Sequence, residues 1–376
     1  MAKLPADILQ GARNLLENCA GMRKGQTLLI LHEGPDAGIY DGTLAGAIAK
    51  AAETAGIRAE LEEVPFAPQA ADPSPALARR MAAADRTLFL ARLGDQIRFR
   101  PSMGPINPVV SYALDAEMLG SGFGQAHFGG LLEIKALVNS ALATAGRVRV
   151  TCPLGTDFSG PGVRFPAAGG DCTITRFPMS VFTPAPASGF AGRVAQAGFL
   201  VGTGSHYYEP YAVALEDVLL VEFDGTRIVR FEGSRRDAQT ARRHYETVGA
   251  RFGIDPWFVH SWHAGIHPGC AYRKAAAENV ERWETGAFGN PRILHLHTCG
   301  DYPPGEISLN VIDPTVEIDG IRLWDQGRLC PERIPGGQRI LDRYPCLARI
   351  FADPETEVGL GPDGRLTLLR DDQSAR

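Results

Sequence analysis

The sequence contains no apolar stretch of the length that a membrane span requires. A transmembrane helix needs about 20 consecutive apolar residues, and no apolar run in these 376 residues approaches that length. The segment from Met1 to Gly21 holds acidic and basic side chains and lacks the apolar centre of a secretory signal. We therefore expect a cytoplasmic protein that has no membrane partner.

The sequence lacks paired cysteine spacings. Seven cysteines are spread between Cys19 and Cys346, and no two of them form a Cys-x-x-Cys pair. An odd number without paired spacing disfavours a disulfide framework or a zinc knuckle. We interpret these residues as mostly buried free thiols.

Two common catalytic signatures and a basic charge balance are also missing. The chain lacks the Gly-x-Ser-x-Gly turn of serine hydrolases. Gly155-Thr156-Asp157 follows an expected strand, but it lacks the further glycines of a phosphate-binding loop. Serine-based hydrolysis and NAD chemistry therefore lose support. The net charge of −5 argues against nucleic acid as a partner, because nucleic-acid binders usually carry a basic face.

The length and the hydrophobic content of the chain predict two domains with full cores. Domains commonly run to about 100–200 residues, and this chain has 376 residues, of which 44% are hydrophobic. In its first part, strand-like apolar runs alternate with amphipathic, helix-like segments. This order predicts βαβ units and a largely parallel sheet. We predict an N-terminal α/β domain over residues 1–150, with strands at 26–32, 58–64, 86–93 and 147–152 and helices at 5–19, 41–56, 75–84 and 131–145.

The composition changes after residue 150. Residues 155–233 are rich in Gly, Pro and Thr and contain short apolar runs, and Asp224-Gly225 between two such runs is a strong hairpin signal. We predict a C-terminal β-rich α+β domain over residues 151–376, with a helix at 234–252 and strands at 198–202, 218–223, 227–231, 292–298 and 316–323.

Histidine carries the clearest functional signal in the sequence. Five of the nine histidines fall between residues 260 and 297. His263 and His267 are four residues apart, a spacing that would put both rings on one face of a helix and suit a metal. However, Gly265 and the pair Pro268-Gly269 indicate a loop. Metal binding and local packing or capping both remain open for these two residues.

His295 and His297 lie in a segment of alternating polar and apolar residues. Such a segment predicts a strand, and its period of two places both imidazoles on one face. Histidine is the commonest metal ligand, so we favour a metal site here. The alternative is a solvent-facing pair on an edge strand.

Glu306 is the carboxylate that we expect to complete this site. Asp301 competes with it, although Asp301 is equally natural as a turn residue before Tyr-Pro-Pro. Two histidines and one carboxylate with open positions would favour Fe(II). The same atoms could hold Zn or Mn and activate water, and the sequence does not separate these metals.

Four further residues are candidates for roles around such a metal. His127 lies in a Gly-rich loop near a helix start, and His206 opens the segment 206–210; each could transfer protons, or could be structural. Arg98 and Arg100 follow an expected parallel strand, where α/β proteins gather ligand-binding groups. Either arginine could pair with a substrate carboxylate, or both could belong to a solvated turn.

Several segments occur in an order known from one group of metalloenzymes. They are residues 147–157, residues 182–186 followed by Gly192, Gly202 and Glu209-Pro210, residues 224–233, and residues 314–320. In this order they resemble the M29-type (thermophilic) aminopeptidases and their 2,5-dihydroxypyridine 5,6-dioxygenase relatives, over about residues 20 to 330. The resemblance implies metal ligands in the C-terminal domain and a homodimer.

The expected ligand set departs from that of the resembled family. Residues 263–268 look more like the dioxygenase branch, in which a histidine in a similar setting ligates iron. The remaining ligands of the family, a His-x-Asp pair, fall on Glu306-Ile307-Ser308 in this chain. We therefore expect a rearranged site that is drawn from His263 or His267, His295, His297 and Glu306.

Together these patterns predict a metal-dependent enzyme with a small-molecule substrate. The first hypothesis is a mononuclear non-haem Fe(II) oxygenase that acts on a small hydroxylated (hetero)aromatic acid. The alternatives are a metal-dependent hydrolase that cleaves an amide or a related bond and a metal-free binding protein on the same fold.

Overall fold

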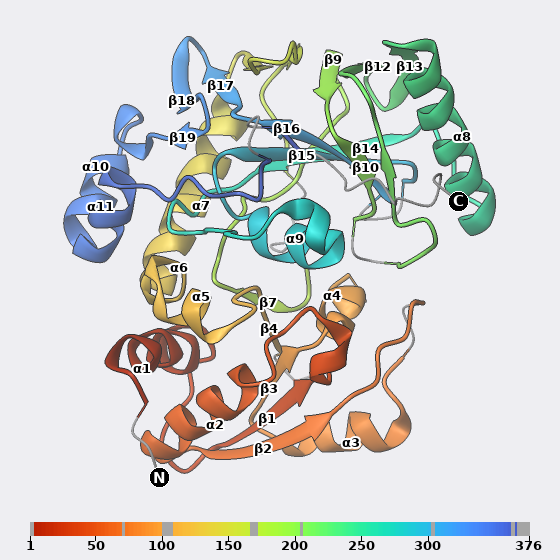
Figure 1. Cartoon of the computed structure of the whole chain (residues 1–376). Helices are drawn as coiled ribbons and strands as arrows, with labels where there is room; N and C mark the ends of the chain where they lie inside the picture. The colour runs from red at the N-terminus through yellow and green to blue at the C-terminus, as the bar shows by residue number, and fades with distance from the viewer. Residues whose placement is uncertain are drawn as a thin grey trace.

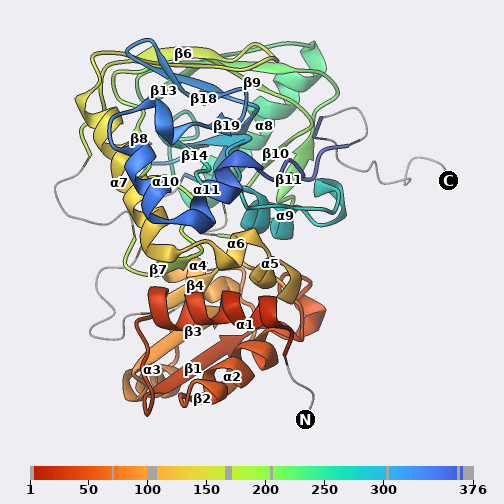
Figure 2. The ribbon, with the colours of Figure 1, turned by 90° about the vertical axis from the view of Figure 1, so that its left-hand side faces the viewer.

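The computed structural model describes residues 4–69, 72–99, 108–165, 172–203, 206–301, 305–361 and 365–366. A parallel sheet with its helices forms one end of the molecule, and two antiparallel sheets form the other end (Figures 1 and 2). The short helices α4 (Arg92–Ile97), α5 (Ala116–Gly120) and α6 (Gly122–Gln125) lie at the level where the two ends meet. Among the described residues, no helix has the length and apolar character needed to cross a membrane.

The parallel sheet has five strands in the order β2-β1-β3-β4-β7. Its central strands are almost wholly buried, as expected for a parallel sheet that is covered on both faces. The helices α1 (Ala6–Arg13), α2 (Leu44–Thr54) and α3 (Pro75–Ala83) belong to this end of the chain. The strands are β1 (Thr27–His32), β2 (Arg58–Glu63), β3 (Arg86–Leu90), β4 (Val109–Ser111) and β7 (Thr175–Phe177).

The other end of the molecule holds two antiparallel sheets. A six-stranded sheet has the order β11-β10-β16-β15-β14-β8, with β8 (Ala185–Pro186), β10 (Phe199–Val201), β11 (Ala212–Ala214), β14 (Val259–Ala264), β15 (Ile293–Thr298) and β16 (Ile307–Ile312). An eight-stranded sheet has the order β13-β12-β9-β6-β5-β17-β18-β19, with β5 (Val148–Thr151), β6 (Asp157–Gly160), β9 (Ala191–Gln196), β12 (Leu219–Asp224), β13 (Arg227–Glu232), β17 (Thr315–Ile318), β18 (Ile321–Asp325) and β19 (Arg328–Leu329).

Aromatic side chains fill the space between these two sheets. Trp262 of β14 is fully buried, and its ring centroid lies 5.8 Å from that of Phe158 on β6 and 5.5 Å from that of Phe190. Side chains alternate between the two faces of a strand. Ser261 and His263, the neighbours of Trp262, therefore point to the opposite face of the six-stranded sheet. That face is the one on which the candidate site forms.

Helices also cover the antiparallel sheets. Helix α7 (Phe128–Thr144) runs along one side together with α10 (Gly337–Arg343) and α11 (Pro345–Ala352) (Figure 2), whereas α8 (Arg235–Phe252) packs near β13 on another side (Figure 1). Helix α9 (Val280–Ala287) stands between β14 and β15 in the sequence. Its N-cap is Asn279, whose side chain accepts a hydrogen bond from the Arg282 amide.

The expected fold class is confirmed: an α/β part with a parallel sheet is joined to a β-rich part, and the Asp224-Gly225 hairpin forms between β12 and β13. Three expectations were wrong. The strand expected at 147–152 in the largely parallel sheet is β5, which pairs antiparallel with β6 and β17 in the eight-stranded sheet. The expected strand at 316–323 is two strands, because Asp319 and Gly320 adopt positive φ angles of 48° and 84° and turn the chain between them. The expected loop around His263 is strand β14 as far as Ala264, and only the glycines and the proline after it leave the sheet.

The chain passes from the parallel sheet to the antiparallel sheets and then returns once to the parallel sheet. Strand β5 begins at Val148 and joins the eight-stranded sheet, whereas the later strand β7 returns to the parallel sheet beside β4. A division of the chain into domains at residue 150 stays a prediction.

Candidate metal centre

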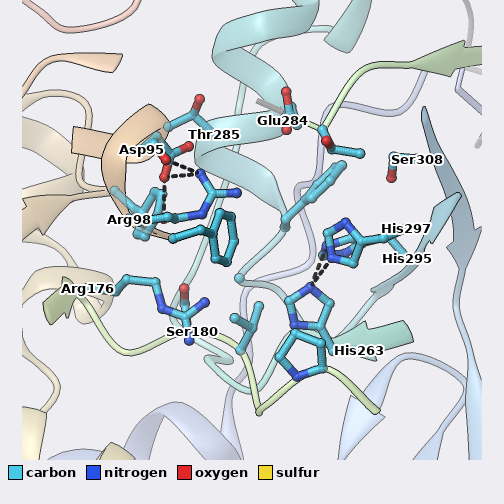
Figure 3. A pocket seen from close by; sticks show the side chains of 17 residues that line it. Asp95, Arg98, Arg176, Ser180, His263, Glu284, Thr285, His295, His297 and Ser308 are labelled. Atoms are coloured by element: carbon cyan, nitrogen blue, oxygen red, sulfur yellow. Dashed lines mark hydrogen bonds and ion pairs between the residues drawn. The ribbon is translucent and has the colours of Figure 1, made fainter. Parts of the chain in front are cut away.

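Three histidines converge on the face of the six-stranded sheet that is opposite Trp262. Strands β14 and β15 are antiparallel neighbours, and their register places His263 directly opposite His295. His297 follows His295 at the period of two and therefore shares its face. The Nε2 atom of His263 lies 2.6 Å from Nε2 of His295 and 3.1 Å from Nε2 of His297 (Figure 3).

Burial keeps these three imidazoles neutral. His263, His295 and His297 are 5%, 4% and 6% exposed. Burial, and then the neighbouring histidine, lowers the pKa of each ring well below its ordinary value. A neutral imidazole carries a proton on one nitrogen and a lone pair on the other. Each ring therefore offers one nitrogen that can bind a cation.

The hydrogen bonding of His263 indicates which of its nitrogens carries the lone pair. Its Nδ1 lies 3.1 Å from the carbonyl oxygen of Phe182, which can only accept, so Nδ1 donates and Nε2 keeps the lone pair. A single lone pair cannot accept strong hydrogen bonds from both His295 and His297. A backbone carbonyl on the outer nitrogen is also the usual support of a metal-binding histidine.

The donor set fits a divalent metal. One ligand atom from each of the three histidines lies within 4.8 Å of the other two, and no other such group of histidine, cysteine, aspartate or glutamate occurs among the described residues. The Nδ1 atoms of His295 and His297 are buried without a hydrogen-bond partner in the described part of the chain. Three neutral imidazoles suit zinc, iron or copper, whereas magnesium and calcium prefer oxygen ligands.

The three histidines line a pocket that reaches the carboxyl edge of the parallel sheet. Four pocket residues come from the ends of its strands. Helix α4, which follows β3, contributes Asp95 and its C-cap Arg98. Tyr112 follows β4, and Arg176 lies on β7. Open α/β sheets gather ligand groups at this edge. The pocket is therefore built from both ends of the molecule (Figure 3).

Two buried guanidinium groups give the pocket a positive character. Arg98 and Arg176 are each 8% exposed. A nitrogen of Arg98 lies 2.6 Å from a carboxylate oxygen of Asp95, and the Tyr112 hydroxyl donates to the same carboxylate at 2.7 Å. Burial lowers the pKa of Arg98, but Asp95, Tyr112 and Cys172 together offset this and hold the pKa above its ordinary value. Arg98 therefore stays charged inside the pocket.

Arg98 lines the same pocket as the three histidines, whereas His267 does not. His267 is fully buried after the end of β14, where its Nδ1 accepts a hydrogen bond from the Gly269 amide and its ring packs against Phe123. Burial lowers the pKa of His267 to about 3. This histidine is outside the three-histidine group.

Glu306 and His206 lie next to each other and apart from the three histidines. A carboxylate oxygen of Glu306 lies 3.3 Å from Nδ1 of His206, and neither residue lines the pocket. Glu306 precedes the first residue of β16, whereas Ser308 within that strand lies opposite His297 and reaches the pocket. The structure therefore places a serine, rather than the expected carboxylate, beside the three histidines.

His127 has a local role at a helix end, and Arg100 lies outside the described residues. His127 is the N-cap of α7: its Nδ1 accepts a hydrogen bond from the Gly130 amide at 3.3 Å, and its ring lies 4.8 Å from that of Tyr344. It does not line the pocket.

Sequence reasoning missed Arg176 and Glu284, which also line the pocket. Arg176 lies on a three-residue strand that no pattern in the sequence indicates. Helix α9 did carry a signal, because Val280, Trp283 and Ala287 have helical spacing after a capping asparagine. Glu284 shares their buried face, and a carboxyl group in such a position is a sign of a functional site.

The fold, two antiparallel sheets joined to a parallel α/β unit, is shared with a solved structure. No protein-family model and no curated protein sequence matches the chain. A 2,5-dihydroxypyridine dioxygenase from Pseudomonas putida is similar with a TM-score of 0.59 and 14% identity, over 89% of this chain and all of the other. AmpT from Thermus thermophilus has a TM-score of 0.49 and 12% identity, over 86% of this chain and 98% of the other. At this identity the first likeness shows the fold, in agreement with the scaffold that the motif order implies.

Proposed function

We propose that the chain is a mononuclear metal-dependent enzyme that acts on a small organic anion. His263, His295 and His297 would hold the metal. The observation that carries this proposal is the convergence of three buried, neutral imidazole nitrogens within 4.8 Å of one another, beside a pocket that also contains two buried guanidinium groups. A cluster of this kind in a pocket is a typical catalytic site.

The side chains of the pocket favour an aromatic carboxylate as the substrate. Asp95 engages one terminal nitrogen of Arg98, and the other N–H groups of Arg98 have no acceptor among the described residues. These groups can bind a carboxylate. Phe99 and Phe288 line the same pocket and would contact an apolar ring, and the ring centroid of Phe288 lies 4.4 Å from that of His295. Arg98 would thus hold the carboxylate while the phenylalanines exclude water from the ring.

For the reaction we propose oxygenation with Fe(II) first. A metal held by three neutral ligands keeps its full positive charge, and iron would supply redox chemistry as well as Lewis acidity. The structural neighbour with a TM-score of 0.59 is a dioxygenase, which supports this choice. A hydroxylated (hetero)aromatic acid would satisfy both the metal and Arg98.

A metal-dependent hydrolase is the second candidate, and the ligand set is the observation that favours it. Three histidines with an open position are also the ligand set of catalytic zinc. No carboxylate from the described residues joins these ligands, whereas a carboxylate with two histidines is the set most typical of iron oxygenases. Zinc or manganese would favour this candidate.

Elemental analysis of protein purified without oxygen, followed by two assays, tests the proposal. We expect about one metal per chain. With iron, oxygen uptake should begin when hydroxylated aromatic acids are added, and with zinc or manganese the protein should hydrolyse amides or related bonds without oxygen. A protein that takes up none of the three metals would contradict the proposal and favour a binding protein. The homodimer implied by the resemblance stays a prediction.

A further inference from the structure

The pocket contains a second carboxyl group, which makes no ion pair with any described residue. Glu284 on α9 lines the pocket and is 9% exposed. One of its oxygens, Oε2, accepts a hydrogen bond from the Tyr211 hydroxyl at 2.6 Å. Its other oxygen, Oε1, has no hydrogen-bond partner, and the side chain makes no ion pair, among the described residues. Figure 3 shows Glu284 among the side chains that line the pocket.

The other carboxylates nearby are already engaged. Asp95 pairs with Arg98 and accepts a hydrogen bond from Tyr112. Glu281, one turn before Glu284 on the same helix, lies in an ion pair with Arg92. Glu284 is therefore the carboxyl group of the pocket that is available to a ligand.

The surroundings of Glu284 favour its protonated form. Burial raises its pKa to about 8; Asp95 and Glu281 also raise it, while the Tyr211 hydrogen bond and Arg98 oppose this change. Tyr207, Tyr208 and Tyr211, whose hydroxyl pKa values the charge of Glu284 raises, remain neutral mainly because they are buried, with pKa values well above their ordinary value.

The proton of Glu284 has a preferred position. Oε2 accepts the Tyr211 hydrogen bond and therefore behaves as the carbonyl oxygen of the acid. The O–H group is then on Oε1, the oxygen without a protein partner. From the pocket lining, this O–H group can donate its hydrogen bond to a ligand or to water.

We infer, on the basis of the proposed function, that Glu284 is a substrate-contacting acid, which donates a hydrogen bond and then its proton to an oxygen anion of the substrate held by Arg98. In that step the O–H bond of Glu284 breaks and an O–H bond forms on the substrate oxygen. The resulting carboxylate keeps the hydrogen bond from Tyr211, which is a positioning residue. The ligand class is an organic acid with a second anionic oxygen.

Binding of isophthalate to the metal-free protein tests this inference. Both carboxylates of isophthalate are ionised between pH 6.5 and pH 9.5, so any change in affinity reports on the protein. We expect the association constant to fall roughly tenfold or more with a midpoint near pH 8, because ionised Glu284 cannot donate and repels the anion. Isothermal titration calorimetry at a series of pH values measures this fall.

Three variants separate a contact from a structural role. Glu284→Gln should bind isophthalate with an affinity that does not change over this pH range. Tyr211→Phe should move the midpoint to higher pH, because the Tyr211 hydrogen bond lowers the pKa of Glu284. Glu278→Gln removes the same charge at an exposed position outside the pocket and should behave like the wild type.

Infrared spectroscopy checks the protonated acid without any ligand. The wild type minus Glu284→Gln difference spectrum should contain a carbonyl band of a protonated carboxylic acid at pH 7, which disappears with a midpoint near pH 8. Absence of this band, absence of isophthalate binding at every pH, or the same pH dependence in Glu284→Gln would each overturn the inference. All of these measurements use metal-free protein, so the inference and the metal site can fail separately.

Discussion

Two groups of histidines in this molecule differ in what their rings face. His263, His295 and His297 point their Nε2 atoms at one another across two neighbouring strands. The other group is scattered. His127 caps α7, His206 pairs with Glu306, His267 accepts from the Gly269 amide, and His244 is buried on α8 beside Tyr208.

Burial alone does not distinguish the two groups. Burial lowers the pKa of His244 to about 4 and that of His267 to about 3, and both rings are neutral like those of the three-histidine group. In the three-histidine group neighbouring rings lower the pKa as well, whereas for His244 and His267 burial is the cause that lowers it. Proximity set by strand register, rather than burial or sequence clustering, therefore marks the candidate metal centre.

The largest effect that follows from this comparison is on metal affinity. His295→Ala removes one of three ligands, so affinity for Fe(II), Zn or Mn should fall by more than the roughly 100-fold that loss of an outer partner can cost. His267→Ala and His206→Ala should each stay within about twofold of the wild type, since neither ring belongs to the group. Competition titration with a coloured chelator measures all three variants. A loss of metal in His267→Ala equal to that in His295→Ala would break the comparison.

Sequence patterns were sufficient to predict the relative position of two of these three histidines. The alternation around His295 and His297 predicted their shared face, because a strand has a period of two wherever it pairs. His263 was a candidate metal ligand, but the glycines after it indicated a loop, so its strand was not predicted. The register that sets His263 against His295 joins residues 32 positions apart, and no local pattern encodes such a pairing.

The carboxylate of the expected site could not be located from spacing. Glu306 is close to His297 in sequence, but β16 begins one residue later, so Ser308 is the residue opposite His297. The fold class, by contrast, followed from alternating strand and helix patterns, which depend on local amphipathic character. Arg98 could be associated with the carboxyl edge of the sheet because it follows a recognisable strand.

A second, smaller effect tests how burial acts on a histidine outside the group. His244 is 5% exposed, and its folded-state pKa of about 4 lies below the ordinary 6.5. Between these values the unfolded chain binds a proton that the folded chain does not, so stability is complete above pH 6.5 and falls as the pH drops. The wild type should lose about 2 kcal/mol through this residue between pH 7 and pH 5.

His244→Leu should lack this part of the acid-induced loss. Urea unfolding of both proteins at pH 7 and at pH 5 gives the difference. The variant should keep its metal affinity, since His244 lies outside the three-histidine group. An identical loss of stability in the variant would show that His244 is protonated in the folded protein.

The smallest effect concerns His127, which the sequence alone left open between proton transfer and structure. Its ring accepts a hydrogen bond from the Gly130 amide at the first turn of α7, and loss of an N-cap costs about 1 kcal/mol. His127→Ala should therefore lower the free energy of unfolding by about that amount, and His127→Asn should restore most of it, because asparagine caps as well. Metal and isophthalate affinities should be the same in all three proteins. Weaker binding in both variants, with stability restored in His127→Asn, would place His127 with the functional histidines.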